Sequence, residues 1–88
     1  MISDLVECTK ALGDKTRLEI LYACRSQWRS VREIVHQVNV SQPTVSHHLA
    51  ALLKLGLVKA QTKGRFTLYL LNQERLRQYC HDLLNSFT

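Results

Sequence analysis

The stretch SQPTVSHHLAALL, from Ser41 to Leu53, decides the fold of this chain. Ser41 is placed to cap a helix, and Pro43 is tolerated in a first turn that uses no internal N–H donors. Apolar residues then recur at helical spacing and predict one buried stripe. The stripe consists of Val45, Leu49, Leu52 and Leu53. The other side chains of the first two turns are amides, hydroxyls and imidazoles, on Gln42, Thr44, Ser46, His47 and His48.

This uncharged polar face differs from an ordinary solvated helix face, which carries mostly Lys, Glu and Arg. Such groups suit hydrogen bonding to base edges in the major groove of DNA, which the N-terminal end of a helix enters. The side chains predicted to contact bases are those of Gln42, Thr44, Ser46 and His47. Ser41 and the backbone N–H groups beside it are predicted to hold a phosphate. For His48, packing against the preceding helix and contact with DNA both stay open. For the whole face, the alternatives are an exposed surface without a partner and a winged-helix interaction module that binds a protein and not DNA.

Three more helices are predicted before this stretch, over residues 3–12, 15–25 and 31–37. Ser3 caps the first and Gly13 ends it, Asp14 caps the second, and Ser30 with Glu33 forms a capping box for the third. The side chains expected on their apolar faces are Leu5, Val6, Thr9 and Leu12, then Leu18, Ile20, Leu21 and Tyr22, then Val31, Ile34, Val35 and Val38. The brief link 39–40 leads into the fourth helix, which gives a helix-turn-helix pattern.

The periodicity changes after Gly56, where the fourth helix is expected to stop. Residues 57–63 and 65–71 alternate as two strands around Gly64 and predict a hairpin. Its basic tip predicts contact with DNA phosphates or with the minor groove. The candidates are Lys63 and Arg65 at the tip, Lys59 on its approach and Arg32 in the third helix. Arg25 and Arg29 are expected in a loop before the third helix and are given no role.

Asn72 is expected to cap a last helix over residues 73–87, with Tyr79 beside its apolar stripe. The stripe consists of Leu76, Cys80, Leu83, Leu84 and Phe87. Four helices, two strands and a final helix predict a mainly α, single-domain winged helix-turn-helix over residues 1–88, with a small β-hairpin. A domain this small needs few helices to close its core. The terminal helices, 3–12 and 73–87, are therefore predicted to join two copies of the chain.

Composition supports a polyanionic partner and gives no sign of catalysis. The formal net charge is +5, from 12 Lys and Arg against 7 Asp and Glu, which favours double-stranded DNA over plain solubility when it is combined with the motif. There is no long apolar run and no signal-like start, so we expect a cytoplasmic protein without a membrane span. No phosphate loop, HExxH or GxSxG is present, so we do not expect an enzyme.

The cysteines allow two readings. Cys8, Cys24 and Cys80 are an odd number without a CxxC pair, which predicts reduced thiols. Free cysteines are often buried, so the first interpretation is that each of the three packs in the core. The second is a sensor, in which thiolates bind soft metal ions or arsenite or form a switchable disulfide. The terminal helices would then bring Cys8 near Cys80, with His81 adjoining, but no two of these residues have ligand spacing within one element.

The chain resembles the arsenic-repressor-like (ArsR/SmtB) family of regulators over nearly its whole length. The matching segments are ALGDKTRLEIL (11–21), SQPTVSHHLAALLKLGLV (41–58) and KGRFTLYLL (63–71). The resemblance implies a homodimer joined by its first and last helices, which binds an imperfect inverted repeat and represses transcription until an inducer releases it. By position, the residues that match the family's DNA-reading and wing residues are Gln42, Thr44, Ser46, His47, Lys63 and Arg65.

This chain differs from the family at the positions where family members bind an inducer. The metal-binding CxC-type motif of the third helix is absent, since Ser30-Val31-Arg32 stands there. The zinc pattern of the last helix is not met: Asn72 and Glu74 stand at its start, and His81 is followed at three residues by Leu84. The spacing of the cysteines does not match the redox-disulfide members either. The resemblance therefore supports DNA binding, predicts no metal or other cofactor and leaves the signal open.

Overall fold

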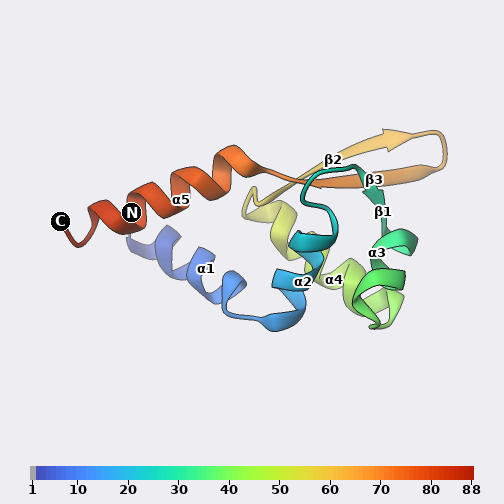
Figure 1. Cartoon of the computed structure of the whole chain (residues 1–88), viewed down its shortest axis with the longest axis horizontal. Helices are drawn as coiled ribbons and strands as arrows, with labels where there is room; N and C mark the ends of the chain where they lie inside the picture. Colours follow the sequence, from blue (N-terminus) through green and yellow to red (C-terminus); the bar gives the residue numbers. More distant parts are fainter. Residues whose placement is uncertain (1) are drawn as a thin grey trace.

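The computed structural model describes residues 2–88, and its elements follow the predicted order with one added strand (Figure 1). The elements are α1 (Ile2–Leu12), α2 (Lys15–Ala23), β1 (Arg29–Ser30), α3 (Val31–Val38), α4 (Gln42–Lys54), β2 (Val58–Lys63), β3 (Phe66–Leu71) and α5 (Gln73–Asn85). This is a mainly helical domain with a small sheet, as predicted. None of the helices in this described part is long and apolar enough to cross a membrane.

The predicted caps fix where three of the helices begin. Asp14 accepts a hydrogen bond from the backbone N–H of Arg17 at 3.0 Å, at the start of α2. At the start of α3, the Glu33 N–H donates to Ser30 Oγ at 3.2 Å and the Ser30 N–H donates to Glu33 Oε1 at 2.9 Å, which completes the capping box. The cap of α5 is Asn72, as expected, although the helix ends at Asn85 rather than near Phe87.

The sheet has three antiparallel strands in the order β1–β3–β2. The hairpin pairs Lys63 with Phe66 around a two-residue turn, and Gly64 supplies the positive φ of 62° that this turn requires. The expectation that Arg29 lies in a loop is wrong, because Arg29 pairs with Tyr69 in β1. The extended backbone that leads into the α3 cap runs beside β3 and adds a strand to the hairpin.

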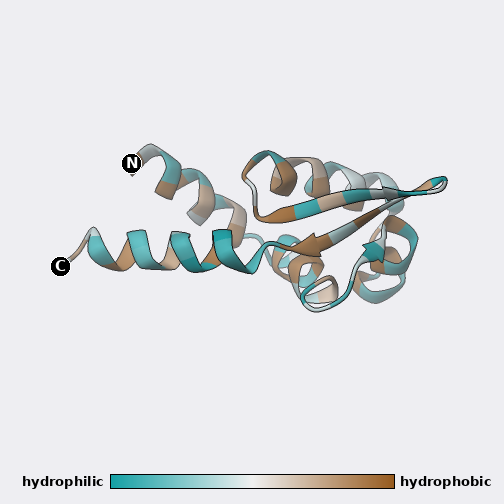
Figure 2. Cartoon of the chain, turned by 90° about the horizontal axis from the view of Figure 1, so that it is seen from above, coloured by the Kyte–Doolittle hydropathy of each residue, from teal (hydrophilic) through white to brown (hydrophobic). Residues whose placement is uncertain are grey.

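The main core lies between α2, α3, α4 and the start of β2. Its fully buried members include Ile20, Ile34, Leu49, Leu52 and Leu57. A second, smaller cluster joins α1 to α5 through Leu5, Cys8 and Tyr79. Figure 2 shows α1 and α5 projecting together from the rest of the domain. With these two helices included, the domain measures 44 × 23 × 18 Å.

Several predicted apolar faces are rotated relative to the observed ones. In α4, Leu53 is 43 % exposed, because the core contacts only the side that carries Val45, Leu49 and Leu52. In α2, the exposed positions are Leu18 and Tyr22, whereas Ile20 and Leu21 are buried. In α1, Val6 is exposed and the buried residues are Leu5, Cys8 and Ala11.

The last helix differs most from its prediction. Tyr79 is the buried residue of α5, and its hydroxyl hydrogen-bonds with Thr9 Oγ1 of α1 at 2.5 Å. Cys80 is exposed, and so are Leu84 and Phe87. Among residues 2–88, α1 packs against this side of α5 and half-buries Leu76 and Leu83, whereas Leu84 and Phe87 lie outside this contact and stay uncovered.

Candidate nucleic-acid interface

The start of α4 presents its polar side chains to solvent, as predicted. Exposed residues are Ser41, Gln42, Thr44, Ser46 and His47, while Val45 and Leu49 anchor the helix in the core. Ser41 Oγ accepts from the backbone N–H of Thr44 at 3.4 Å and lies 2.8 Å from Thr44 Oγ1. The cap therefore orients both hydroxyls, and the side chains of Gln42, Ser46 and His47 project from the same two turns.

His48 packs within the chain, but against a different helix from the one expected. Its ring is half-buried, and Nδ1 accepts a hydrogen bond from Arg17 Nε of α2 at 3.2 Å. The backbone N–H of Arg17 is held in turn by Asp14, and this hydrogen bond lowers the pKa of the Asp14 carboxyl. Arg17 is thus fixed beside α4. Sequence reasoning missed this contact because it joins residues 31 positions apart.

The wing and α3 meet the start of α4 around a hollow of about 370 Å³. The side chains that line it include three of the predicted DNA-contacting residues, each from a different part of the fold: Arg32 of α3, Gln42 of α4 and Arg65 of the β2–β3 turn. Phe66 also lines the hollow and is 63 % exposed, a feature that the sequence reasoning did not single out. The fold therefore combines one amide and two guanidinium groups on a single concave surface.

The basic side chains of this surface are not neutralised by nearby carboxylates. Among residues 2–88, one ion pair lies within 4 Å: it joins Arg29 of β1 to Glu33 in the first turn of α3, at 3.6 Å. The backbone hydrogen bond from Ser30 lowers the pKa of Glu33, so this carboxylate serves the capping box. Arg32 and Arg65 remain available for an external anion.

Lys59 lies apart from the other predicted wing cations. It stands near the base of β2, four residues before Lys63, and a strand of that length spans about 13 Å. It lines a separate hollow together with Arg25 and Arg77. The structure thus brings together Arg32 and Arg65 but not Lys59.

The cysteines do not converge. Cys8 and Cys24 are fully buried, as the packing reading predicts, and burial raises the pKa of Cys24 to about 11. Cys8 Sγ accepts a hydrogen bond from Arg75 Nη2 at 3.4 Å. The prediction that Cys80 packs within the chain is wrong, because Cys80 is exposed on α5. In the described part of the chain, no three His, Cys, Asp or Glu side chains gather as metal ligands.

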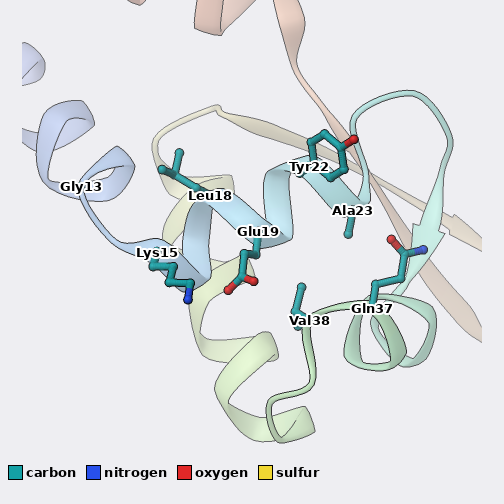
Figure 3. Close-up of a pocket in the computed structure, with 8 residues that line it drawn as sticks. All are labelled: Gly13, Lys15, Leu18, Glu19, Tyr22, Ala23, Gln37 and Val38. Carbon is teal, nitrogen blue, oxygen red and sulfur yellow. The ribbon is translucent and has the colours of Figure 1, made fainter.

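A further hollow, of about 790 Å³, lies between α2 and the end of α3 (Figure 3). Figure 3 shows Glu19 of α2 and Val38 of α3 on opposite sides of it, with Leu18 and Tyr22 on α2. None of the predicted DNA-contacting residues lines this hollow. It is therefore separate from the surface formed by α4 and the wing.

Residues 14–60 match the model of the bacterial regulatory protein arsR family, and this segment holds the helix-turn-helix and the start of the wing. The chain is 38% identical over 73 residues to an uncharacterized HTH-type transcriptional regulator of Methanocaldococcus jannaschii, a match that covers 82% of each chain. It is 33% identical over 76 residues to the transcriptional repressor SdpR of Bacillus subtilis, which covers 86% of this chain and 84% of SdpR.

Solved structures agree over almost the whole domain. An ArsR-like transcriptional regulator from Rhodococcus sp. RHA1 superposes with a TM-score of 0.87 at 28% identity, over 96% of this chain and 79% of that one. The homodimeric winged helix-turn-helix DNA-binding domain of Mb0332 from Mycobacterium bovis gives 0.79 at 26% identity, over 97% and 80%. The chain thus belongs to the arsR family of bacterial regulatory proteins and is a DNA-binding transcriptional repressor with a winged helix-turn-helix fold.

Proposed function

We propose that this repressor binds an inverted-repeat operator as a homodimer and that an inducer releases it. Each subunit places the start of α4 in a major groove and lays the β2–β3 wing on the flanking backbone. The observation that carries this proposal is the shared hollow of Gln42, Arg32 and Arg65. Its lining combines an amide able to pair with a base edge and two guanidinium groups suited to phosphates. Such a protein acts on DNA in the cytoplasm.

Base reading is assigned to Gln42, Thr44, Ser46 and His47, which share the exposed start of α4. Phosphate binding is assigned to Ser41 with the first-turn N–H groups of α4, and to Arg32, Lys63 and Arg65. The helix dipole favours an anion at this end of α4, and the guanidinium groups provide bidentate donors. The base-reading and the phosphate-binding residues are neighbours on one surface. A helix that lies in a groove needs this arrangement, because the DNA backbones run along both sides of the groove.

A change at Gln42 tests base reading. Gln42→Ala removes a donor and an acceptor without touching the buried face of α4, so affinity for a selected operator falls by about 1–3 kcal/mol while affinity for unrelated DNA is kept. Mobility shift with both DNAs measures the difference. The matched control is Gln37→Ala at the exposed end of α3, outside this surface. Equal loss on both DNAs from Gln42→Ala would exclude base readout by this side chain.

The dimer is proposed to form through the uncovered apolar residues of α1, of α5 and of the short segment that follows α5. Ile2, Leu84 and Phe87 are 70 %, 65 % and 84 % exposed, and Val6 lies on the same part of the molecule as Ile2 and Phe87. Exposed apolar patches of this kind mark interaction sites. A two-fold axis there would place two copies of α4 symmetrically, which is why the operator is expected to be an inverted repeat.

Charge inserted at this patch should separate the subunits. Leu84→Glu and Phe87→Glu should give a monomer in sedimentation velocity with unchanged helical content by circular dichroism. Leu53→Glu on the exposed edge of α4 is the control, since Leu53 is 43 % exposed and lies on another element. A dimer that survives the changes at Leu84 and Phe87 would show that the subunits meet elsewhere.

A further inference from the structure

A second basic surface lies around the point where α5 begins. Arg25, Lys59 and Arg77 line one hollow of about 590 Å³, and they come from the α2–β1 loop, the base of the wing and α5. Figure 1 shows the α2–β1 loop and the first turn of α5 in front, with α4 behind them. Among the predicted DNA-contacting residues, this hollow contains only Lys59. It is thus a separate concentration of positive charge.

Arg25 is held in place on this surface by three contacts. Its guanidinium carbon lies 3.7 Å from the centroid of the Tyr22 ring, and Nη1 donates to the Tyr22 carbonyl at 2.8 Å. Gln73 Nε2 of α5 donates to the Arg25 carbonyl at 3.4 Å. The cation–π contact uses one face of the guanidinium and leaves donors on its edge. These contacts reduce the entropy that Arg25 would lose on binding a ligand.

The first turn of α5 adds donors to the same hollow. Asn72 caps the helix by accepting from the Arg75 N–H at 3.2 Å, so the N–H groups of Gln73 and Glu74 have no acceptor within the helix. Glu74 is the carboxylate in the lining, and within the described residues it forms no ion pair inside 4 Å with the three cations. The lining therefore keeps an excess of positive charge beside the positive end of a helix dipole.

We propose that this hollow is a binding site for a phosphate-bearing anion, held by Arg25, Lys59 and Arg77. Two guanidinium groups offer paired donors to phosphate oxygens, and the ammonium group adds a point charge. The anion would connect α5 to the base of the wing. The phosphate can belong to a small effector or to DNA that flanks the operator.

The experiment follows amide chemical shifts of the full chain during titration with pyrophosphate at constant ionic strength, without DNA. We expect saturable shifts at residues 25–26, 59 and 72–77. Arg25→Gln, Lys59→Gln and Arg77→Gln should each weaken binding by roughly tenfold. Lys15→Gln and Lys54→Gln remove the same charge at exposed positions outside the hollow and should leave binding unchanged.

A second arm separates the two sources of phosphate. Operator DNA with and without a long flank is titrated in place of pyrophosphate, and a shift at residues 72–77 only with the long flank assigns the phosphate to DNA. Equal weakening by the control variants, or shifts that do not saturate with either probe, would overturn the site. Neither outcome bears on Gln42, so this inference and the proposed base readout can fail independently.

Discussion

The wing makes a quantitative prediction about salt. Lys63 and Arg65 flank Gly64 at the exposed turn of the hairpin, and Arg65 lines the hollow beside Gln42. If both contact phosphates, replacing them with Gln removes counterion release without changing base contacts. Affinity should therefore fall by a similar factor on operator and unrelated DNA.

The magnitude follows from the number of phosphate contacts. Each phosphate neutralised contributes a slope of about −0.9 to the plot of log K against log salt concentration. A dimer carries each wing residue twice, so Lys63→Gln or Arg65→Gln alone should reduce the slope by about 1.8. The double variant should reduce it by about 3.6, as far as the two contacts are independent.

Fluorescence anisotropy with labelled operator, measured from about 50 to about 200 mM salt, gives these slopes directly. Lys54→Gln is the control with the same charge change, because Lys54 is exposed at the opposite end of α4 from Gln42, about 18 Å along the helix. A double variant with the slope of the wild type would refute the phosphate role of the wing. So would a slope that changes equally in Lys54→Gln.

Three further predictions concern the stability of the fold. Burial raises the pKa of Cys24 to about 11, so the native thiol should resist alkylation by iodoacetamide, as measured by mass spectrometry. The free energy of unfolding should also fall as pH rises from about 9 towards that value, because the thiol ionises first in the unfolded chain. A reactive native Cys24 would contradict its burial. The pKa of Glu33 is lowered in the fold, so its contribution to stability is present above its unfolded pKa and is lost as pH falls through the folded pKa. Glu33→Gln should therefore weaken the loss of stability at acid pH that urea titrations measure. Ser30→Ala removes the cap of α3 and should lower the free energy of unfolding by about 1 kcal/mol. Leu52→Ala should cost about 2–5 kcal/mol in urea unfolding, since Leu52 is fully buried, and similar losses from Leu53→Ala would show that the core is assigned to the wrong face.

Local signals in the sequence predicted the elements well. Asp14, Ser30 with Glu33, and Asn72 each cap a helix through bonds that span three residues, so the sequence alone contains both partners. The turn at Gly64 is equally local. The elements and the polar start of α4 could therefore be predicted before any tertiary contact was known.

Features that depend on distant partners could not be predicted. The strand at Arg29 exists because β3 runs beside it, and the contact of Arg17 with His48 joins two helices. The apolar stripe of α5 is wide, so only the packing of α1 shows that Tyr79 faces inward and Cys80 outward. The position of Lys59 likewise depends on distant partners. Its pairing with Leu70 sets it at the base of the wing, and it shares a hollow there with the first residues of α5.

The most direct test of the account is an amide chemical-shift map of the protein titrated with its operator. We expect the largest changes at residues 41–44, 46–47, 32 and 63–66, with smaller ones at Val45, Leu49 and Leu52 on the buried face of α4. Changes confined to the hollow between α2 and α3, or no difference between operator and unrelated DNA at residues 42–47, would contradict base reading by the start of α4.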